Sequence, residues 1–509
     1  MVAVVDVKLV AYSIEPLALS VATARTCYSK KIVLPNDVKQ ETKQRIGKSI
    51  YASGHHTPFQ HATFTFAISN VSRHFVWSFL HTHPYYNSEQ TSQRYNVLGK
   101  ENFFIPKGLT EHQISMYKKA IENAWESYSK ITEILKKEKK HLAETLGKIK
   151  GWNEKAISSD LEKKAIENAR YALPICAHTN LYHTISALVL QRYVRMASTS
   201  ECYEEAKEVV AKMVEEVKKI DPSFFDAISE YAYSREEAPE YITSESNSKY
   251  YDSFAREFDS ALGNYKRSKL VRYTENAEEL IAEAINECIG KKLSKEEALD
   301  FVLNPKNNIY LLSTLNVSFH SPLMQCLHHI AYTFKKKLSH CCDSQNQRHR
   351  GTPGSRPLLS KMHSSKPDYI IPEFIANSES VELYKQTITQ LWETKTMLEA
   401  EGLTKEVSCY LLPNAVPIRF TETAPLIHLI HKLKMRTCFN AQHEIYDASK
   451  EELEQIDKVT PGIAKYIGPP CFIGKGIVKE DPLIGPCTEG VRWCGIKVWL
   501  GWPNVKRPF

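Results

Sequence analysis

Three short polar motifs, each containing an arginine, are the first places to look for chemistry in this chain. They are Ser92-Gln93-Arg94-Tyr95, Asn168-Ala169-Arg170-Tyr171 and Met435-Arg436-Thr437. A guanidinium group gives a phosphate or carboxylate paired, charge-assisted hydrogen bonds that a lysine cannot reproduce. The net charge of +7 is modest for 509 residues, and its lysines lie in mixed Lys/Glu runs typical of solvated helix faces. These features favour a small anionic ligand over a nucleic acid.

The segments that must position these motifs occur twice along the chain. Each copy has a strand, a helix ending at a cysteine, a His-x-Pro turn before an apolar run, and a Leu-Pro after long amphipathic segments. The matched residues are Cys27 with Cys288, Pro58 with Pro322, Glu89–Tyr95 with Asp343–His349, and Pro174 with Pro413. The spacing between matches drifts mainly where loops intervene, so we predict two diverged copies of one domain.

The length also favours two domains over one. We place the first domain at 1–231, a linker at 232–265, the second domain at 266–465 and a C-terminal extension at 466–509. The linker includes Ser244-Glu245-Ser246-Asn247-Ser248, and its aromatic residues suggest that it packs against the domains. The chain shows no signal-peptide pattern and no apolar run long enough to span a bilayer, so we expect a cytoplasmic protein without a membrane partner.

Taken in this order, the motifs resemble those of the flavin-dependent thymidylate synthase family. The resemblance covers both halves, from about 1 to 230 and from 266 to 465. It implies an α/β (α+β) subunit with a twisted, mostly antiparallel sheet and long helices. It also implies FAD as cofactor, with NADPH and methylenetetrahydrofolate as co-substrates for adding a one-carbon unit to C5 of dUMP. The family is a homotetramer, so we expect this chain to form a homodimer that acts as a pseudo-tetramer.

The resemblance implies roles for individual residues. It assigns catalysis to Arg436 and Ser92, where the arginine would stabilise negative charge on the uracil carbonyl as C5 becomes nucleophilic. Nucleotide-binding residues would be Glu89, Gln90, Gln93, Arg94, Arg170 and Gln442. Flavin-binding residues would be Ser29, Thr57, Gln60, His81 and His83. No residue is assigned to a metal.

The family hallmark, Arg-His-Arg followed by seven residues and a serine, is incomplete in both halves. Counting back from Ser92 puts His83 at the central histidine, and a one-residue slip instead matches His81-Thr82-His83. Both placements lack the arginines that contact flavin in the family. The second half contains Arg348-His349-Arg350, which we interpret as a false match because the repeat alignment places it elsewhere.

The losses in the two halves are complementary. The first half keeps Arg170 before Leu-Pro, whereas the second has Cys409 there; the second half keeps the uracil-reading segment around Arg436. We therefore predict a composite site in which Ser92, Arg94 and Arg170 face Arg436 and Gln442.

Simpler interpretations remain open for several of these residues. Arg436 could pair with Glu444, Ser92 could cap a helix, and His81 and His83 could be structural. A homologue that binds nucleotides without redox chemistry, or a structural partner of a separate synthase, would also account for the missing arginines.

The 12 cysteines are expected to be reduced thiols in a cytosolic protein. Cys471, Cys487 and Cys494 lie in the C-terminal extension, which departs from the family. With Cys409, Cys438 or a histidine nearby, they could hold zinc or an iron–sulfur cluster. The chain has no Cys-x-x-Cys pair, so packing is the preferred interpretation of these residues, and of His340-Cys341-Cys342-Asp343.

Overall fold

A computed structural model describes residues 4–228, 231–242 and 248–508 of the chain. These residues fold into two compact units that exchange segments along the sequence. Unit 1 comprises Met1–Asn123, Pro174–Asn247 and Glu393–Leu412. Unit 2 comprises Ala124–Leu173, Ser248–Trp392 and Pro413–Phe509. Each unit therefore contains most of one sequence repeat together with a helical segment from the other.

Unit 1 is built on a four-stranded antiparallel sheet in its described residues. The strands are β1 (Asp6–Tyr12), β2 (Thr63–Ser72), β3 (Asn87–Gln90) and β4 (His178–Ser186), in the order β1-β2-β4-β3. Along β2, Phe64, Phe66 and Ile68 are buried while the residues between them are more exposed. This alternation is what a strand with one face on a core requires.

Unit 2 repeats the same topology in its described residues. Its strands are β5 (Ser268–Tyr273), β6 (Ala331–Ser339), β7 (Gly354–Ser355) and β8 (Pro417–Pro425), in the order β5-β6-β8-β7. The central pairs share one register, because Phe66 lies opposite His183 and Phe334 lies opposite Glu422. The predicted duplication and the predicted antiparallel fold are thus confirmed.

Helices make up the rest of each copy. The first sequence half holds α1 (Pro16–Thr26), α2 (Gln40–Ala52), α3 (Arg73–His81), α4 (Glu111–Ile149), α5 (Glu154–Ala169), α6 (Ala187–Met196), α7 (Tyr203–Ile220) and α8 (Ser223–Ala227). The second half holds α11 (Ala277–Ile289), α12 (Lys295–Leu303), α13 (His340–Asn346), α14 (Glu373–Ala376), α15 (Val381–Ala400), α16 (Lys405–Ser408), α17 (Leu426–Arg436), α18 (His443–Val459) and α19 (Pro461–Ala464). The C-terminal extension adds α20 (Pro470–Ile473) and α21 (Val498–Gly501).

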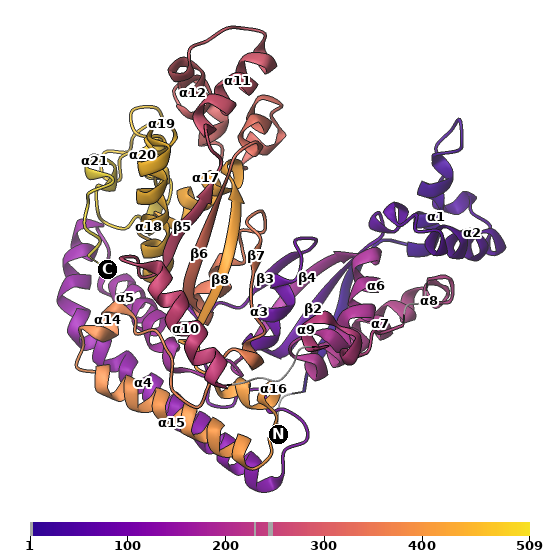
Figure 1. The fold of residues 1–509 in the computed structure, drawn as a ribbon, viewed down its shortest axis with the longest axis horizontal. Coiled ribbons are helices and arrows are strands. Elements are labelled where there is room, and N and C mark those ends of the chain that lie inside the picture. Colours follow the sequence, from indigo (N-terminus) through magenta and orange to yellow (C-terminus); the bar gives the residue numbers. More distant parts are fainter. Residues whose placement is uncertain (1–3, 229–230, 243–247, 509) are drawn as a thin grey trace. The chain divides into compact units, whose positions relative to one another are not determined.

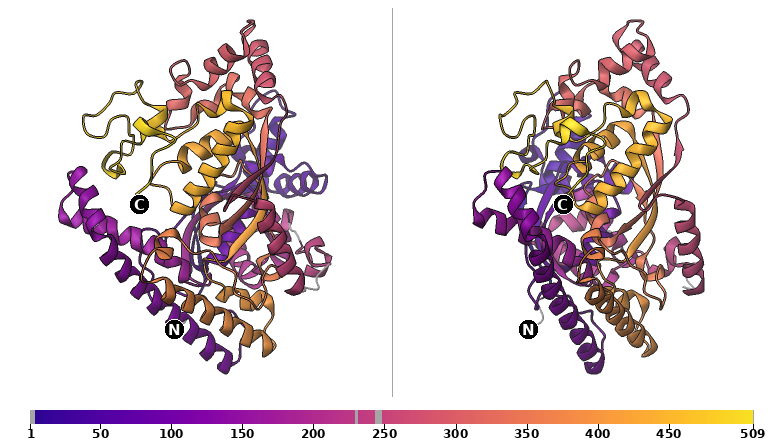
Figure 2. Two further views of the ribbon diagram at one scale, coloured as in Figure 1. Left: turned by 60° about the vertical axis from the view of Figure 1, so that its left-hand side comes forward. Right: turned by 90° about the vertical axis from the view of Figure 1, so that its left-hand side faces the viewer.

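Matching helices cover matching strands in the two units. Helix α7 lies along β1 and β2 in unit 1, and α18 lies along β5 and β6 in unit 2 (Figures 1 and 2). Their buried faces carry apolar residues at helical spacing, such as Val209, Val210 and Met213 in α7. The first residues of α7 and α18 are therefore held in place by a sheet in each unit.

The described part of the predicted linker is ordered and packed. It forms α9 (Pro239–Ile242) and α10 (Ser248–Leu262). In unit 2 the Tyr251 hydroxyl donates to Asp368 at 2.7 Å, and Arg419 donates to Asp259 at 2.8 Å. The predicted linker residues Ser244-Glu245-Ser246-Asn247 lie outside the described residues.

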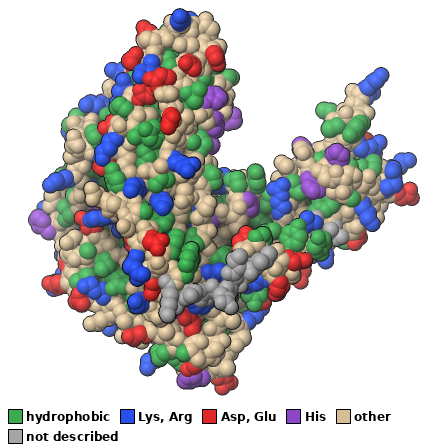
Figure 3. Space-filling view, in the orientation of Figure 1, with side chains coloured by type: hydrophobic (Ala, Val, Ile, Leu, Met, Phe, Trp, Pro, Cys, Tyr) green, Lys and Arg blue, Asp and Glu red, His purple; other side chains and the backbone are tan. Residues whose placement is uncertain are grey.

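Basic and acidic side chains are interspersed over the face shown in Figure 3. This distribution agrees with the small excess of positive charge in the sequence. None of the helices in the described part of the chain is both long and apolar enough to cross a membrane.

Candidate functional site

A buried Ser–Glu–Tyr arrangement organises the site region of unit 2. Ser339 caps α13, and its N–H and hydroxyl donate to the two carboxylate oxygens of Glu444 at 2.7 and 2.6 Å. The hydroxyl of Tyr171 donates to the same carboxylate at 2.6 Å. Tyr171 belongs to the first sequence repeat, in the 3-10 turn Arg170–Ala172. The exchanged helical segment therefore contributes directly to this part of unit 2.

Unit 1 contains the same arrangement with the repeats reversed. Ser72 caps α3 and donates to Glu205 through its N–H at 2.6 Å and its hydroxyl at 2.7 Å. Tyr410, from the second repeat, donates to Glu205 at 2.9 Å. Burial raises the pKa of Glu205 to about 7, although the hydrogen bonds from Ser72 and Tyr410 oppose the shift. This carboxyl group thus holds its proton over part of the neutral range.

Gln442 is the hub of the polar network in unit 2. Its side-chain oxygen accepts from Arg170 Nη2 at 2.9 Å and from the side-chain amide of Gln345. Its own amide nitrogen donates to the hydroxyl of Tyr171. Arg170 and Gln442 are only 6% and 2% exposed. Two residues predicted to bind the nucleotide, one from each repeat, are therefore in direct contact.

Arg436 joins the same network at the end of α17. Its Nε donates to His349 Nε2 at 2.8 Å, and its Nη2 donates to the backbone oxygen of Gln345 at 3.1 Å. The pKa of His349 lies well below its usual value, because of burial first and then the charges of Arg436 and Lys432. A neutral imidazole can accept this hydrogen bond, so His349 orients the guanidinium group without placing a second positive charge beside it. Gln345 links Arg436 to Gln442.

A cleft of about 610 Å³ opens beside this network within unit 2. It is lined by Tyr171, Gln442 and Glu444 on the network side. Lys266, Arg267 and Lys450 bring positive charge to its walls, while Glu373, Asp447 and Glu451 bring negative charge. Its size suits a small organic ligand, and its lining offers both hydrogen-bond donors and acceptors.

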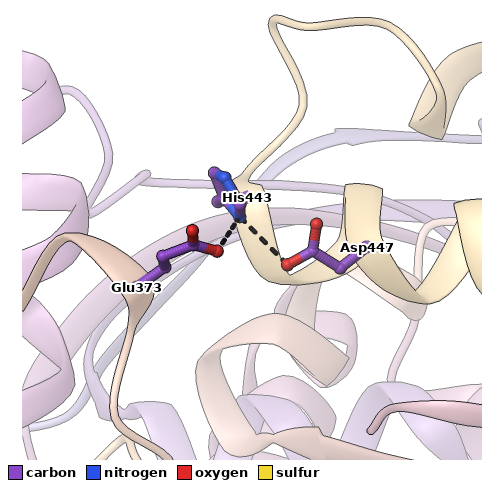
Figure 4. Close-up of side chains that lie close together, drawn as sticks. All are labelled: Glu373, His443 and Asp447. Carbon is purple, nitrogen blue, oxygen red and sulfur yellow. Dashed lines mark hydrogen bonds and ion pairs between the residues drawn. The ribbon is translucent and has the colours of Figure 1, made fainter. Parts of the chain in front are cut away.

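Three side chains with metal-ligand chemistry meet at the wall of this cleft. Glu373 on α14 faces His443 and Asp447 on α18 (Figure 4). His443 Nδ1 lies 3.0 Å from Asp447 Oδ2 and 3.9 Å from Glu373 Oε2. Glu373 is 64% exposed at its side chain, so the group faces solvent. These contacts are those of a solvated ion-pair cluster.

Unit 1 has an ion pair at the corresponding place. The matched backbone bonds are Phe104 N to Cys176 O at 2.8 Å and Ile370 N to Ala415 O at 3.0 Å. Lys107 and Glu373 each lie three residues after the donor of this bond, so they are equivalent positions in the two copies. Lys107 pairs with Glu208 at 2.7 Å. The two copies thus use opposite charges at equivalent positions.

The equivalent of Arg170 in unit 1 is Cys409, so a thiol replaces the guanidinium group there. Cys409 Sγ lies 3.2 Å from His74 Nε2, and both residues are completely buried. Burial lowers the pKa of His74 to about 3 and raises that of Cys409 well above its usual value. Both groups are therefore neutral near pH 7, and they lack the thiolate–imidazolium character of a nucleophilic pair. The adjoining cavity has only about 40 Å³.

The motif with Ser92 and Arg94 lies in unit 1, after β3. The Ser92 hydroxyl accepts from the N–H of Arg94 at 3.2 Å, and Arg94 lies 5.4 Å from the ring centre of Tyr95. Ser92 thus stabilises a turn; the alternative that it caps a helix is wrong. Of the neighbouring residues predicted to bind nucleotide, Gln90 accepts from Arg73 at 3.1 Å, Gln93 is buried and Glu89 is exposed.

The residues predicted to contact flavin are all in unit 1 and differ in their surroundings. Ser29, Thr57 and Gln60 are exposed. His81 bonds to the backbone oxygen of Trp77 at 2.7 Å, and His83 bonds to the Tyr193 hydroxyl at 2.9 Å. The contacts of the two histidines agree with the structural alternative. Flavin binding by these five residues stays a prediction.

The structure corrects the placement of the Arg-His-Arg string. Ser72 and Ser339 are equivalent caps, and His81 and Arg348 each follow their serine by nine positions, 81 − 72 and 348 − 339. Arg348-His349-Arg350 therefore stands where His81-Thr82-His83 stands in the first copy. The interpretation of this string as a false match is wrong, because Asp343–His349 imitates the polar string Glu89–Tyr95 without standing at its place.

The match between Glu89–Tyr95 and Asp343–His349 was wrong for the same reason. Ser88 pairs with His183 on β4, and Gly354 pairs with Glu422 on β8. The equivalent of Ser92 is therefore Leu358, which is separated from Arg350 by seven residues. The hallmark is divided: the second copy keeps its arginines and the first copy keeps its serine.

Other functional residues were missed from sequence. Arg436 contacts His349 and Gln345, so the suggested pairing with Glu444 is wrong. Neither Gln345 nor His349 was assigned a role. Glu444 could have been found from its spacing in the sequence, because Glu444 and Glu205 follow the Leu-Pro of their own repeat at the same distance.

A family model and similar proteins of known name agree on one family. A family model described as "Thymidylate synthase complementing protein" matches residues 8–223 and again residues 269–462. A flavin-dependent thymidylate synthase of Clostridium tetani is 30% identical over 225 residues, which cover 43% of this chain and 85% of that protein. The Saccharolobus solfataricus enzyme of the same name is 26% identical over 218 residues, covering 42% and 81%. A solved UMP/dUMP methylase of Streptomyces cacaoi aligns at 16% identity and a TM-score of 0.32, covering 45% of this chain and 96% of that one.

Proposed function

The chain belongs to the family of thymidylate synthase complementing proteins, and from this premise we propose that it is an atypical FAD-dependent thymidylate synthase. It would add a one-carbon unit from methylenetetrahydrofolate to C5 of dUMP, with electrons from NADPH. The observation that supports the proposal best is the chain of contacts from Arg170 through Gln442 and Gln345 to Arg436. These contacts join Arg170 of the first repeat, which the family resemblance assigns to the phosphate, to Arg436 of the second repeat, which it assigns to the uracil.

The residues present fit a flavin nucleotide on chemical grounds. Arg348 and Arg350 flank His349, so two guanidinium groups stand next to the residue that orients Arg436. Paired donors of this kind suit the diphosphate and pyrimidine oxygens of FAD. When bound, FAD would supply the carrier for the one-carbon unit and the hydride. Arg348 and Arg350 would hold it.

The protein's own contribution to the reaction would be electrostatic. Arg436 would donate to a uracil carbonyl oxygen, and it would stabilise the negative charge that develops as C5 becomes nucleophilic. His349 keeps this guanidinium oriented because its neutral ring accepts from Nε. Arg170 would bind the phosphate from a buried position, where a charged hydrogen bond is stronger than in water. The burial of Gln442 would exclude water from between the two arginines.

The composite site also includes Ser92 and Arg94, as part of the same proposal. These residues come from the copy that retained the end of the hallmark. They would supply the nucleotide contacts that Leu358 and its neighbours can no longer make. The complete assembly would be a homodimer equivalent to the family's tetramer, which gel filtration coupled to light scattering would test.

A tritium-release assay with dUMP labelled at C5 tests the proposal. Release by the reconstituted protein should require FAD, NADPH and methylenetetrahydrofolate. Arg436→Ala and Arg94→Ala should each lower the rate by about 100-fold, the range for loss of one charge-stabilising donor. Arg195→Ala is a matched control, because Arg195 contacts the Tyr233 ring in unit 1. A protein without flavin absorption bands after reconstitution would contradict the proposal.

A nucleotide-binding homologue without redox chemistry is the second candidate. It is favoured by the division of the hallmark between two copies, since neither copy has the whole of it. Calorimetry separates the two candidates. Binding of dUMP without binding of FAD would support the second, and formation of dTMP that depends on methylenetetrahydrofolate would exclude it.

A further inference from the structure

Four cysteines of unit 2 gather where the C-terminal extension meets the end of α17. Cys438 lies two residues after Arg436, Cys471 lies on α20, and Cys487 and Cys494 lie in the loop between α20 and α21. Cys471 is buried and the other three are partly buried. All four are free thiols. The extension therefore brings three thiols to the segment that follows Arg436.

Hydrogen bonds tie the segments that carry these cysteines to each other. The side-chain amide of Asn440 donates to the backbone oxygen of Arg492 at 2.7 Å and approaches Glu489 Oε2 at 3.5 Å. The Cys494 thiol donates to the oxygen of Ile496 at 3.6 Å. The turn after Cys438 is thus bound directly to the loop that runs from Cys487 to Cys494.

Each of the four thiols lies within electrostatic range of the other three. Cys471 lies close enough to Cys438, Cys487 and Cys494 to interact with the charge of each. Cys438 lies within the same range of Cys494 and Cys487. Cys487 and Cys494 also lie within this range of each other. Together these interactions connect all six pairs.

The spacing of the thiols distinguishes the kinds of centre they could hold. A tetrahedral zinc with sulfur at 2.3 Å needs its thiolates about 3.8 Å apart. Among the described residues, only Glu373, His443 and Asp447 bring three potential ligand atoms within 4.8 Å of one another. The four thiols are therefore more widely spaced than a single zinc ion requires. A cluster of four irons and four sulfides is larger, and it takes one thiolate at each iron.

We propose that Cys438, Cys471, Cys487 and Cys494 bind a [4Fe–4S] cluster that fastens the C-terminal extension to unit 2. When a preformed cluster is transferred, each cysteine sulfur bonds to one iron and displaces a thiolate of the carrier, which takes up the proton of the cysteine thiol; no oxidation state changes. Lys150 and Lys164 lie near Cys494, so their positive charges would offset the negative charge of a thiolate-bound cluster. Burial limits access of water to the iron.

The cluster would also fix the position of residues in the candidate site. Beyond Cys494, Arg507 donates to the backbone oxygen of Ala441 at 2.6 Å and lies 5.1 Å from the ring centre of Tyr446. Lys450 donates to the oxygen of Pro503 at 3.0 Å. Ala441 adjoins Gln442, so the extension holds the segment between Arg436 and α18. Loss of the cluster should release this hold.

Metal analysis of the full chain tests the assignment, and it requires no substrate, so its result is independent of the proposed function. The protein would be purified without oxygen and reconstituted with ferric iron, sulfide and dithiothreitol. The expected result is about four iron and four acid-labile sulfide ions per chain, with a Mössbauer spectrum of a four-iron cluster. One zinc per chain without sulfide, or no bound metal, would overturn the assignment.

Single variants locate the centre. Cys487→Ser and Cys494→Ser should lose at least half of the iron, whereas Cys288→Ser, an exposed cysteine on α11 of the same unit, should keep it all. Circular dichroism shows whether each variant is folded. Trypsin should cleave the extension of the folded, iron-depleted variants at Arg492 faster than that of the loaded protein. Full iron content in both ligand variants, or equal cleavage of depleted and loaded protein, would refute the proposal.

Discussion

Units 1 and 2 keep the same Ser–Glu–Tyr arrangement but surround it with different chemistry. In unit 2 the network continues from Glu444 and Tyr171 to Gln442 and Arg170. In unit 1, Glu205 and Tyr410 are joined in the same way, and the place of Arg170 is taken by Cys409 in its neutral contact with His74. The shared part is what supports the helix caps and the strand ends. After duplication, one copy could therefore replace its arginine with a cysteine while the framework around that position was retained.

The two sheets differ in the same way behind the network. In unit 2, Lys336, Glu422, Lys432 and Glu452 are completely buried and form ion pairs. At the position of Glu422, unit 1 has His183, which bonds to the Tyr193 hydroxyl at 2.9 Å. Burial lowers the pKa of His183 to about 3, so it is neutral. One copy therefore has buried charges where the other has buried neutral groups.

The largest effect should come from breaking this buried charge cluster. Glu422→Ala leaves Lys336 and Lys432 with one carboxylate, Glu452, between them. The free energy of unfolding of unit 2 should fall by about 3–5 kcal/mol, the usual cost of removing one member of a buried ion pair. Urea denaturation followed by near-ultraviolet circular dichroism measures it. The matched change His183→Ala in unit 1 should cost less, and an equal loss in both would remove the distinction between the two sheets.

The stability of unit 1 should depend on pH through Glu205. Its folded pKa of about 7 exceeds the ordinary value of 4.5, so the folded state retains a proton that the unfolded state releases between these values. The stabilisation is complete below about pH 4.5 and is lost as pH rises through about 7, a change of about 3 kcal/mol. Glu205→Gln should be insensitive to pH over this window.

Thermal unfolding at pH 5 and pH 8 provides the measurement. The melting temperature of the wild type should fall more between these values than that of Glu205→Gln. Glu215→Gln, an exposed position on the same helix, is the control and should behave as the wild type. Parallel curves for wild type and Glu205→Gln would mean that Glu205 is already ionised in the folded state.

Replacing Arg170 by its counterpart in unit 1 tests whether the anion site is confined to unit 2. Arg170→Cys removes a hydrogen bond from a charged donor, worth about 1.5–3 kcal/mol. The dissociation constant for dUMP should therefore rise about 10- to 100-fold in calorimetry. Cys409→Ser in unit 1 should leave it unchanged. If the two variants bind dUMP equally well, the complementary loss of function between the repeats is not supported.

The sheet and the duplication were predictable because they depend on local patterns. Alternating residues such as Phe64 and Phe66 identify a strand wherever it occurs, and Phe334 repeats them at the same register. The arginine motifs were also recognisable as short strings. The contacts of these arginines were harder to predict. Arg170 can be recognised in the sequence because it precedes a Leu-Pro pair, but its hydrogen bond to Gln442 depends on a helical segment of the first repeat that belongs to unit 2.

The error in aligning Arg348-His349-Arg350 has a related cause. Asp343–His349 resembles Glu89–Tyr95 in its polar residues and its arginine, and sequence alone offers no fixed point that would separate the two possible alignments. The capping serines Ser72 and Ser339 provide that point only once their hydrogen bonds to Phe75 and Cys342 are known. Residues whose contacts depend on the tertiary fold, such as His349 with Arg436, leave little trace in local sequence.

The smallest expected effect concerns the cleft wall, where the copies carry opposite charges. Glu373→Lys would reproduce in unit 2 the pairing of Lys107 with Glu208, because Asp447 occupies the place of Glu208 three residues after the network glutamate. An exposed pair contributes about 0–1 kcal/mol, so the melting temperature should rise by at most a few degrees and should respond to added salt. Glu379→Lys, on the same connection but outside the cleft lining, is the control. A clear fall in stability with Glu373→Lys would show that Glu373, His443 and Asp447 act together and require both carboxylates. The two copies would then be equivalent at this position in their backbones but not in their side chains.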